Sequence, residues 1–147
     1  MDLILWRHAD AEDGVPDEAR KLTAKGEKQA RRVAKWLAKR LPDDTRVLVS
    51  PARRAQQTAK ALTKKFEICN EVGTTTVPSA LVKAAGWPDG DGTVLVVGHQ
   101  PVVGQTVALL LLGEASDWAF KKGAIWWLSS RGRGAAVVRA VMAPELA

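Results

Sequence analysis

The chain has few of the residues on which many protein sites depend: it contains one cysteine, two histidines and no tyrosine. The single cysteine, Cys69, excludes an intrachain disulfide and is typical of a reducing compartment. One cysteine and two histidines are also too few soft ligands for an ordinary structural zinc site. We therefore expect no bound metal and no cofactor, so nucleophilic or near-neutral acid chemistry depends on His8 and His99.

Long apolar runs are missing as well. The apolar stretch from Val107 to Leu112 is far shorter than the roughly 18 to 20 residues that a membrane-spanning helix needs. The first residues, from Asp2 to His8, have neither the basic start nor the length of a signal peptide. We expect neither secretion nor membrane insertion, and we predict a cytoplasmic location.

The remaining composition is that of an ordinary globular domain. The 147 residues are 46% hydrophobic and 26% charged, and a chain of this length can build a core without disulfides or metals. Lysine and arginine outnumber aspartate and glutamate by 22 to 16, and this net charge of +6 favours anionic partners. Because no repeat, low-complexity segment or linker divides the chain, residues 1–147 are expected to form one domain.

Strand and helix patterns alternate along the chain. Short apolar runs predict strands at residues 3–6, 46–49, 66–68, 93–97, 124–128 and 136–141. Apolar residues at helical spacing predict helices at residues 24–41, 51–65 and 102–112, the second with Ser50 as N-cap and Pro51 as its first residue. Residues 71–92 are expected to be mostly loop, with weak signals near Thr76 and Leu81.

This order predicts an α/β fold with three layers, α/β/α, and a largely parallel central sheet. The last two strands are expected to form an antiparallel hairpin with a turn at residues 131–134. In such sheets the binding crevice lies beyond the carboxyl ends of the strands. Arg7 and His8 end the first strand, Ser50 ends the second and His99 ends the fourth.

Four side chains suited to phosphate chemistry therefore fall at one sheet edge: Arg7, His8, Arg54 and His99. Any one of them could be a surface residue, but together they suit a tetrahedral dianion. The planar fork of arginine pairs with two phosphate oxygens, and helix amino ends add N–H donors. Ser50 is a weaker rival nucleophile, since no Gly-x-Ser-x-Gly elbow surrounds it and an N-cap role explains it.

The chain resembles the histidine phosphatase superfamily, whose fold is phosphoglycerate mutase-like. Four motifs between residues 3 and 112 carry the resemblance in the order of the family: Arg7-His8-Ala9, Leu22-Thr23-x-x-Gly26, Ser50-Pro51-x-x-Arg54-Ala55-x-x-Thr58 and Gly98-His99-Gln100-Pro101. The short length, with no large cap insertion, is similar to that of the SixA-type phosphohistidine phosphatases.

The resemblance implies a role for each site residue. His8 would be the nucleophile, which takes the phosphoryl group and forms a phosphohistidine intermediate that water hydrolyses without a metal. Arg7 and Arg54 would hold phosphoryl oxygens, and a protonated His99 would donate to another oxygen. Arg20, which matches an arginine of SixA-like chains, and Gln100 complete the expected substrate-binding residues.

Two positions depart from the family pattern. Ala9 stands where glycine is usual, and its Cβ either crowds the phosphate or is tolerated. Many members also have a glutamate general acid after a proline in the loop that precedes the second histidine, but no carboxylate follows Pro78. We assign no general acid. The candidate substitutes are Asp10, Glu12, Asp89 and Asp91.

The missing acid bears on the substrate. A phosphomonoester leaves as a poor alkoxide and needs a positioned acid, an effect worth about 10² to 10⁴ in rate. Phosphohistidine instead releases an imidazole, which departs neutral once its ring is protonated. We therefore predict a metal-independent phosphohistidine phosphatase whose partner is a phosphohistidine-bearing protein, such as a phosphotransfer domain, and whose pocket takes phosphate or sulfate.

Other functions stay open. The first is a broader phosphomonoesterase of the same fold, and the second is a phosphohistidine-binding module without turnover. Nucleic-acid binding suits the positive charge, but no known motif supports it and the tryptophans do not interleave with the basic residues. The basic helix would suit an acidic phosphotransfer partner, although a charge run is usually a solvated face. Its cations are Lys25, Lys28, Arg31, Arg32, Lys35 and Lys39.

Overall fold

The computed structural model describes residues 1–132 and 135–147 and is built around a six-stranded sheet with the order β3-β2-β4-β1-β5-β6. The strands are β1 (Asp2–Arg7), β2 (Arg46–Val49), β3 (Glu67–Ile68), β4 (Thr93–Gly98), β5 (Ile125–Ser130) and β6 (Ala136–Met142). Strands β1 to β4 are parallel, whereas β5 pairs antiparallel with β1 and β6 antiparallel with β5. The predicted sheet and hairpin are confirmed. The turn expected at residues 131–134 includes residues 133 and 134, which lie outside the described residues.

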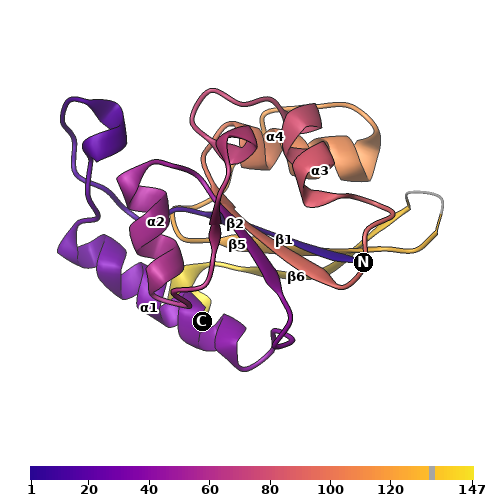
Figure 1. Cartoon of the computed structure of the whole chain (residues 1–147), viewed down its shortest axis with the longest axis horizontal. Helices are drawn as coiled ribbons and strands as arrows, with labels where there is room; N and C mark the ends of the chain where they lie inside the picture. Colours follow the sequence, from indigo (N-terminus) through magenta and orange to yellow (C-terminus); the bar gives the residue numbers. More distant parts are fainter. Residues whose placement is uncertain (133–134) are drawn as a thin grey trace.

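Helices cover both faces of the sheet, so the predicted three layers are confirmed. Figure 1 shows α1 (Ala24–Ala38) and α2 (Arg53–Lys60) on one face and α3 (Pro78–Ala85) and α4 (Val102–Leu112) on the other. Side chains that alternate along β1 supply both cores, because successive residues of a strand point to opposite faces. Leu3 and Leu5 pack in the cluster that includes α3 and α4, and Ile4 and Trp6 pack in the cluster that includes α1 and α2.

The first helix, α1, follows its sequence signals at its start. The Thr23 side chain accepts a hydrogen bond from the backbone N–H of Gly26 at 3.0 Å and so caps the helix. Its apolar stripe, which includes Val33 and Leu37, is buried against the sheet. The helix ends at Ala38, three residues before the predicted end at residue 41.

The second helix, α2, is shorter than predicted at both ends. It begins at Arg53 with Ala52 as N-cap, so the prediction that Ser50 caps a helix beginning at Pro51 is wrong. The Ser50 hydroxyl instead accepts a hydrogen bond from the backbone N–H of Ala52, within a turn that precedes the helix. The helix ends at Lys60 rather than 65, because the next residues carry the chain back to the sheet edge, where β3 pairs with β2.

The segment expected to be mostly loop contains a helix, α3. Pro78 stands in its first turn, Leu81 and Ala85 are buried one turn apart, and Gly86 ends the helix in the left-handed conformation with a φ of 77°. The weak helical signal near Leu81 was therefore correct, whereas no described strand includes Thr76.

Short 3-10 helices occur at Asp17–Ala19 (η1), Asn70–Val72 (η2) and Pro144–Leu146 (η3). Over the described ranges, no helix has both the length and the apolar character that a membrane crossing requires.

Candidate active site

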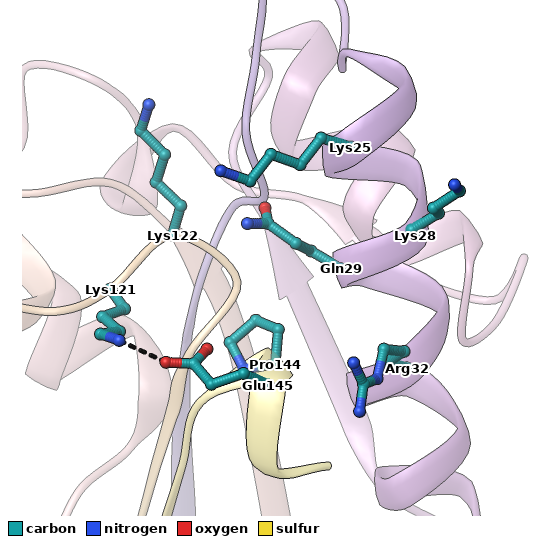
Figure 2. Close-up of a pocket in the computed structure, with 8 residues that line it drawn as sticks. All are labelled: Lys25, Lys28, Gln29, Arg32, Lys121, Lys122, Pro144 and Glu145. Atoms are coloured by element: carbon teal, nitrogen blue, oxygen red, sulfur yellow. Dashed lines mark hydrogen bonds and ion pairs between the residues drawn. The ribbon is translucent and has the colours of Figure 1, made fainter.

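A pocket of about 310 Å³ lies at the carboxyl ends of β1, β2 and β4. All six residues expected from the sequence to form the site line it: Arg7, His8, Arg20, Arg54, His99 and Gln100. Four further lining residues were not predicted: Ala11, Asp17, Thr74 and Lys122. Lys122 also lines a neighbouring basic hollow, which is shown in Figure 2.

Both ring nitrogens of His8 have a partner: Nδ1 faces the carbonyl oxygen of Ala9, and Nε2 faces Arg54. Its backbone N–H extends the β1–β4 pairing to Gly98 at 3.0 Å. Nδ1 lies 2.7 Å from the carbonyl oxygen of Ala9, and because a carbonyl only accepts, Nδ1 is assigned the proton. Nε2 therefore carries the lone pair and accepts a hydrogen bond from Nε of Arg54 at 3.3 Å.

Burial keeps this imidazole neutral. Burial is the largest cause, and together with the positive charges of Arg54 and Arg7 it lowers the pKa of His8 to about 4. At neutral pH the ring is therefore unprotonated at Nε2. A neutral imidazole with a free lone pair is the form that a nucleophilic histidine needs.

Arg54 and Arg7, the two arginines expected to hold phosphoryl oxygens, each donate a hydrogen bond to a backbone carbonyl. Arg54 is 5% exposed and donates through Nη1 to the carbonyl oxygen of Asp17 at 2.8 Å, in addition to its contact with His8. Arg7 donates through Nη1 to the carbonyl oxygen of Phe120 at 2.6 Å, and its buried Nε has no partner among the described residues. Anchored guanidinium groups meet an oxyanion with little loss of side-chain freedom.

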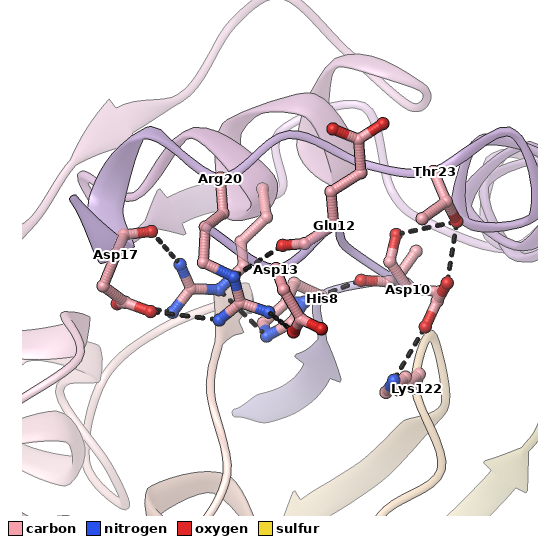
Figure 3. A network of polar contacts seen from close by, with 10 residues as sticks. His8, Asp10, Glu12, Asp13, Asp17, Arg20, Thr23 and Lys122 are labelled. Carbon is pink, nitrogen blue, oxygen red and sulfur yellow. Dashed lines mark hydrogen bonds and ion pairs between the residues drawn. The ribbon is translucent and has the colours of Figure 1, made fainter. Parts of the chain in front are cut away.

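Asp17, which the sequence analysis missed, joins two of the arginines (Figure 3). One carboxylate oxygen accepts from Arg20 at 3.0 Å and the other accepts from Arg54 at 3.1 Å. The hydrogen bonds from Arg20 and Arg54 are the main causes that hold the pKa of Asp17 below its usual value. Arg20 is fixed further by a 2.6 Å bond from its Nε to the carbonyl oxygen of Glu12. Arg20 and Arg54 therefore share an internal counter-ion, whereas Arg7 does not contact it.

His99 lies against His8, with 5.1 Å between the ring centroids, and is 3% exposed. Its Nε2 is 2.7 Å from the hydroxyl oxygen of Ser50, and its buried Nδ1 has no partner within the described part of the chain. Burial, followed by the charges of His8 and Arg54, lowers the pKa of His99 to about 3. Among the protein groups alone His99 is therefore neutral, and its protonated form beside a bound phosphoryl group stays a prediction. A cation at this position needs the negative charge of a phosphoryl group beside it.

Comparisons with known proteins determine the family. Residues 3–75 match the family model for the histidine phosphatase superfamily, branch 1. The chain is also 36% identical over 127 residues to the phosphohistidine phosphatase SixA of Escherichia coli K12, a match that covers 78% of this chain and 76% of the relative. This chain belongs to the histidine phosphatase superfamily.

Two further comparisons agree with this membership. This chain is 33% identical over 126 residues to the phosphohistidine phosphatase SixA homologue of Haemophilus influenzae. The match covers 75% of this chain and 77% of the relative. A structure of the protein histidine phosphatase SixA complexed with tungstate matches it with a TM-score of 0.85 at 31% identity, covering 98% of this chain and 97% of that one. The near-complete coverage of both chains confirms the predicted fold without a large cap insertion.

The unusual Ala9 is tolerated in this superfamily member because its side chain packs away from the pocket. Ala9 is fully buried in a small cluster with Leu22 and Ala30 and is not among the residues that line the pocket. Its backbone N–H donates to the hydroxyl of Thr58 at 3.1 Å, and that hydroxyl donates to the carbonyl oxygen of Arg54 at 2.8 Å. Thr58 thus connects the loop after His8 to helix α2, which carries Arg54.

None of the four candidate substitutes for the general acid lines the pocket of this superfamily member; they are Asp10, Glu12, Asp89 and Asp91. Asp10 is paired with Lys122 at 2.7 Å, and that hydrogen bond is the first cause that lowers the pKa of this carboxyl. Residues 89 and 91 precede β4 and so lie at the opposite end of the sheet. Among the described residues, Asp17 is the only carboxylate that lines the pocket.

Proposed function

We propose that the protein is a phosphohistidine phosphatase that acts on phosphohistidine-bearing proteins without a metal, through a phosphohistidine intermediate on His8. The observation that carries this proposal is the neutral His8, whose Nε2 lone pair faces the buried guanidinium of Arg54 in a pocket that Arg7 and His99 also line. The 36% identity with a SixA of that activity supports the same reaction class. Residues 1–147 acting as one domain, and a cytoplasmic location, are part of the proposal.

The first half of the reaction transfers the phosphoryl group between imidazoles. Nε2 of His8 attacks the phosphorus while the P–N bond of the substrate breaks, and the substrate imidazole leaves neutral when its other nitrogen already carries a proton. Arg7 and Arg54 stabilise the charge on the phosphoryl oxygens. Because the bond formed and the bond broken are of the same kind, neither a Lewis acid nor a strong proton donor is required.

The second half is hydrolysis of the intermediate. Water attacks the phosphorus, and the electron pair of the breaking P–N bond returns to Nε2 of His8. Orthophosphate leaves with both protons of the water, while the two arginines still neutralise its charge. The dianion beside His99 favours its protonated form, so His99 acquires a proton and donates it in a hydrogen bond to a phosphoryl oxygen. His8 returns to the neutral form that Ala9 and Arg54 hold.

The ionised state of Asp17, the carboxylate that lines the pocket, favours phosphohistidine as the substrate over alkyl phosphate esters. Asp17 is bonded to Arg20 and Arg54, and these bonds keep its pKa low, so at neutral pH it has no proton to donate. An alkoxide leaving group therefore receives no help from a carboxylic acid among the described residues of the pocket. An imidazole leaving group does not need that help.

The test measures phosphate release from a phosphorylated phosphotransfer domain and from an aryl phosphate, with a chelator present. We expect the wild type to favour the phosphohistidine substrate and His8→Asn to release no phosphate while keeping the wild-type thermal midpoint. Rapid quenching should trap an acid-labile, alkali-stable phosphate on the wild type and none on His8→Asn. Activity confined to the aryl phosphate would instead support the broader phosphatase, and phosphate binding without release would support a binding module.

A further inference from the structure

Beside the active-site pocket lies a second hollow of about 680 Å³, which we call the basic groove. Helix α1 forms one wall, and the segment before β5 and the C-terminal 3-10 helix η3 form the other (Figure 2). The groove is lined by Lys25, Lys28, Gln29, Arg32, Lys121, Lys122, Pro144 and Glu145. Five of these eight side chains are cations. Lys121 pairs with Glu145 and Lys122 pairs with Asp10, so the net positive charge of the groove comes from Lys25, Lys28 and Arg32.

The groove adjoins the proposed reaction centre. Lys122 lines both the basic groove and the pocket that contains His8. A molecule that fills the groove therefore reaches the edge of the pocket. A small phosphoramidate in the pocket does not need the groove, whereas a protein that brings a phosphohistidine to His8 must rest on the surface around it.

The positive charge continues beyond the groove along α1. Five cations follow one another at alternating spacings of three and four residues and so lie on one side of the helix: Lys25, Lys28, Arg32, Lys35 and Lys39. We call them the basic stripe, and at 1.5 Å per residue it is about 21 Å long. An adjoining hollow, lined by Arg32, Lys35 and Lys39 among others, prolongs the groove along it.

The stripe differs from an ordinary solvated helix face. Like charges three or four residues apart repel and destabilise a helix, and solvated faces usually mix both signs. No residue of the stripe forms an ion pair with a side-chain carboxylate within residues 1–132 and 135–147, although Arg32 donates to the carbonyl oxygen of Ala147. Glu27, the one acidic residue of α1, lines a different hollow together with Arg31. Compensation within the described chain is partial: Lys25 acts on Asp10 and Arg32 acts on Glu145 only through longer-range attraction, without an ion pair.

We infer that the basic groove and the basic stripe are a docking surface for an acidic face of the protein that carries the phosphohistidine. The inference rests on the proposed function and names the surface by which the substrate protein is recognised. The positive charge of the surface and its position next to the pocket, with Lys122 at the border of both, favour this occupant. A single-stranded nucleic acid fits less well, because among the described residues no aromatic side chain lines the groove, and Trp36 in the adjoining hollow already has the guanidinium of Arg40 over its ring, 4.2 Å from the centroid.

The test compares two triple variants with the same change of charge. Lys25→Gln/Lys28→Gln/Arg32→Gln neutralises the groove wall without touching a residue of the pocket. The control, Lys60→Gln/Lys64→Gln/Lys65→Gln, removes three exposed charges elsewhere. Each variant is assayed on a phosphorylated phosphotransfer domain with an acidic face and on N-phosphoimidazole.

We expect the groove variant to raise KM for the protein substrate about tenfold and to leave kcat unchanged, since each exposed charge contributes modestly. Hydrolysis of N-phosphoimidazole should be unchanged, and the control variant should match the wild type on both substrates. Added salt should raise KM of the wild type more steeply than KM of the groove variant. Equal KM values of the groove variant and the wild type on the protein substrate would overturn the inference.

Binding of the unphosphorylated domain separates this inference from the proposed function. If the wild type hydrolyses neither substrate, the proposed function fails, and docking is then decided by whether the groove variant binds the domain more weakly than the control does. A groove variant that loses affinity for single-stranded DNA, with no change toward the protein, would assign the surface to nucleic acid and overturn the inference.

Discussion

The carboxylate of Asp17 lies 3.1 Å from Nη2 of Arg54, whose Nε lies 3.3 Å from Nε2 of His8. The same guanidinium therefore contacts the proposed nucleophile and an internal counter-ion. A phosphoryl group that bonds to Arg54 must share this cation with Asp17. The negative charge of Asp17 thus opposes anion binding, while its hydrogen bonds orient the arginine.

Replacing Asp17 by asparagine separates these two effects. The amide of the Asp17→Asn variant would keep an acceptor for one arginine but remove the charge, and Arg54 keeps its bond to the backbone carbonyl at residue 17. For a half-exposed carboxylate we expect about 1 kcal/mol, so orthophosphate should inhibit Asp17→Asn at about fivefold lower concentration. Asp13→Asn is the control, because Asp13 is fully exposed and lies 4.0 Å from Arg20. Weaker inhibition of Asp17→Asn would show that orientation of Arg54 dominates.

Arg7 and Arg54 should be far more important for catalysis than an arginine outside the pocket. Arg7→Ala or Arg54→Ala removes a donor to the transferring phosphoryl group, and comparable deletions cost on the order of 3 to 4 kcal/mol, or about 10² to 10³ in kcat/KM. Arg53 precedes Arg54 on α2 but is exposed and does not line the pocket. Arg53→Ala should therefore stay within about twofold of the wild type in steady-state assays. A large loss in Arg53→Ala would mean that helix α2, rather than the guanidinium of Arg54, is responsible.

Ser50 is expected to act through His99. Its hydroxyl is fully buried and 2.7 Å from Nε2 of that ring, so it fixes the orientation of the imidazole. We expect Ser50→Ala to lower kcat about tenfold with little change in KM, as for loss of one buried hydrogen bond. The double variant Ser50→Ala/His99→Ala should be no worse than His99→Ala, because coupled residues are not additive. Additive losses in this cycle would contradict a positioning role.

The sequence predicted those elements whose signals are local. The helix at residues 102–112 was predicted with its bounds because an apolar run ends at Gly113, and the histidines were placed because they follow strongly apolar strands. Asp17 and Lys122 were missed because loops bring them to the pocket through contacts over 37 and 112 residues, which no local pattern reveals. Ser50 was misassigned because Ser-Pro is a common helix start, whereas here the buried His99 takes the hydroxyl.

The buried histidines should make folding stability depend on pH. Burial lowers the pKa of His8 to about 4 and of His99 to about 3, whereas histidines of the unfolded chain titrate near 6.5. Between these values the unfolded chain binds more protons than the folded protein, so the free energy of unfolding falls as the pH is lowered. From pH 7.5 to 4.5 we expect a loss on the order of 2 to 3 kcal/mol per histidine.

Urea unfolding in phosphate-free buffer at several pH values measures this dependence. His8→Gln and His99→Gln should each flatten the slope between pH 6.5 and 4.5, because each removes one buried group that titrates. Asp10, whose pKa is lowered mainly by Lys122, contributes only below about pH 4 and does not mask the effect. An unchanged slope in both variants would show that the histidines are not the source.

Gly26 provides a test in which packing opposes helix propensity. In an exposed helix, alanine in place of glycine is stabilising by roughly 0.5 to 1 kcal/mol. A Cβ at Gly26 would lie 1.9 Å from the carbonyl oxygen of Asp10, whose carboxylate accepts a hydrogen bond from Thr23 at 2.7 Å. Because the obstacle is backbone in a loop held by that bond, Gly26→Ala should be destabilising by about 2 to 4 kcal/mol.

Thermal unfolding compares this variant with Lys28→Ala, an exposed change on the same helix that should alter stability by less than about 0.5 kcal/mol. Phosphatase activity should fall in Gly26→Ala even below its unfolding transition. The Asp10 backbone is two residues from His8, and its displacement disturbs the Ala9 carbonyl that fixes the protonated nitrogen of the nucleophile. A stabilised Gly26→Ala would mean that the loop after His8 yields easily, so the close approach of Asp10 would not be what requires glycine at this position.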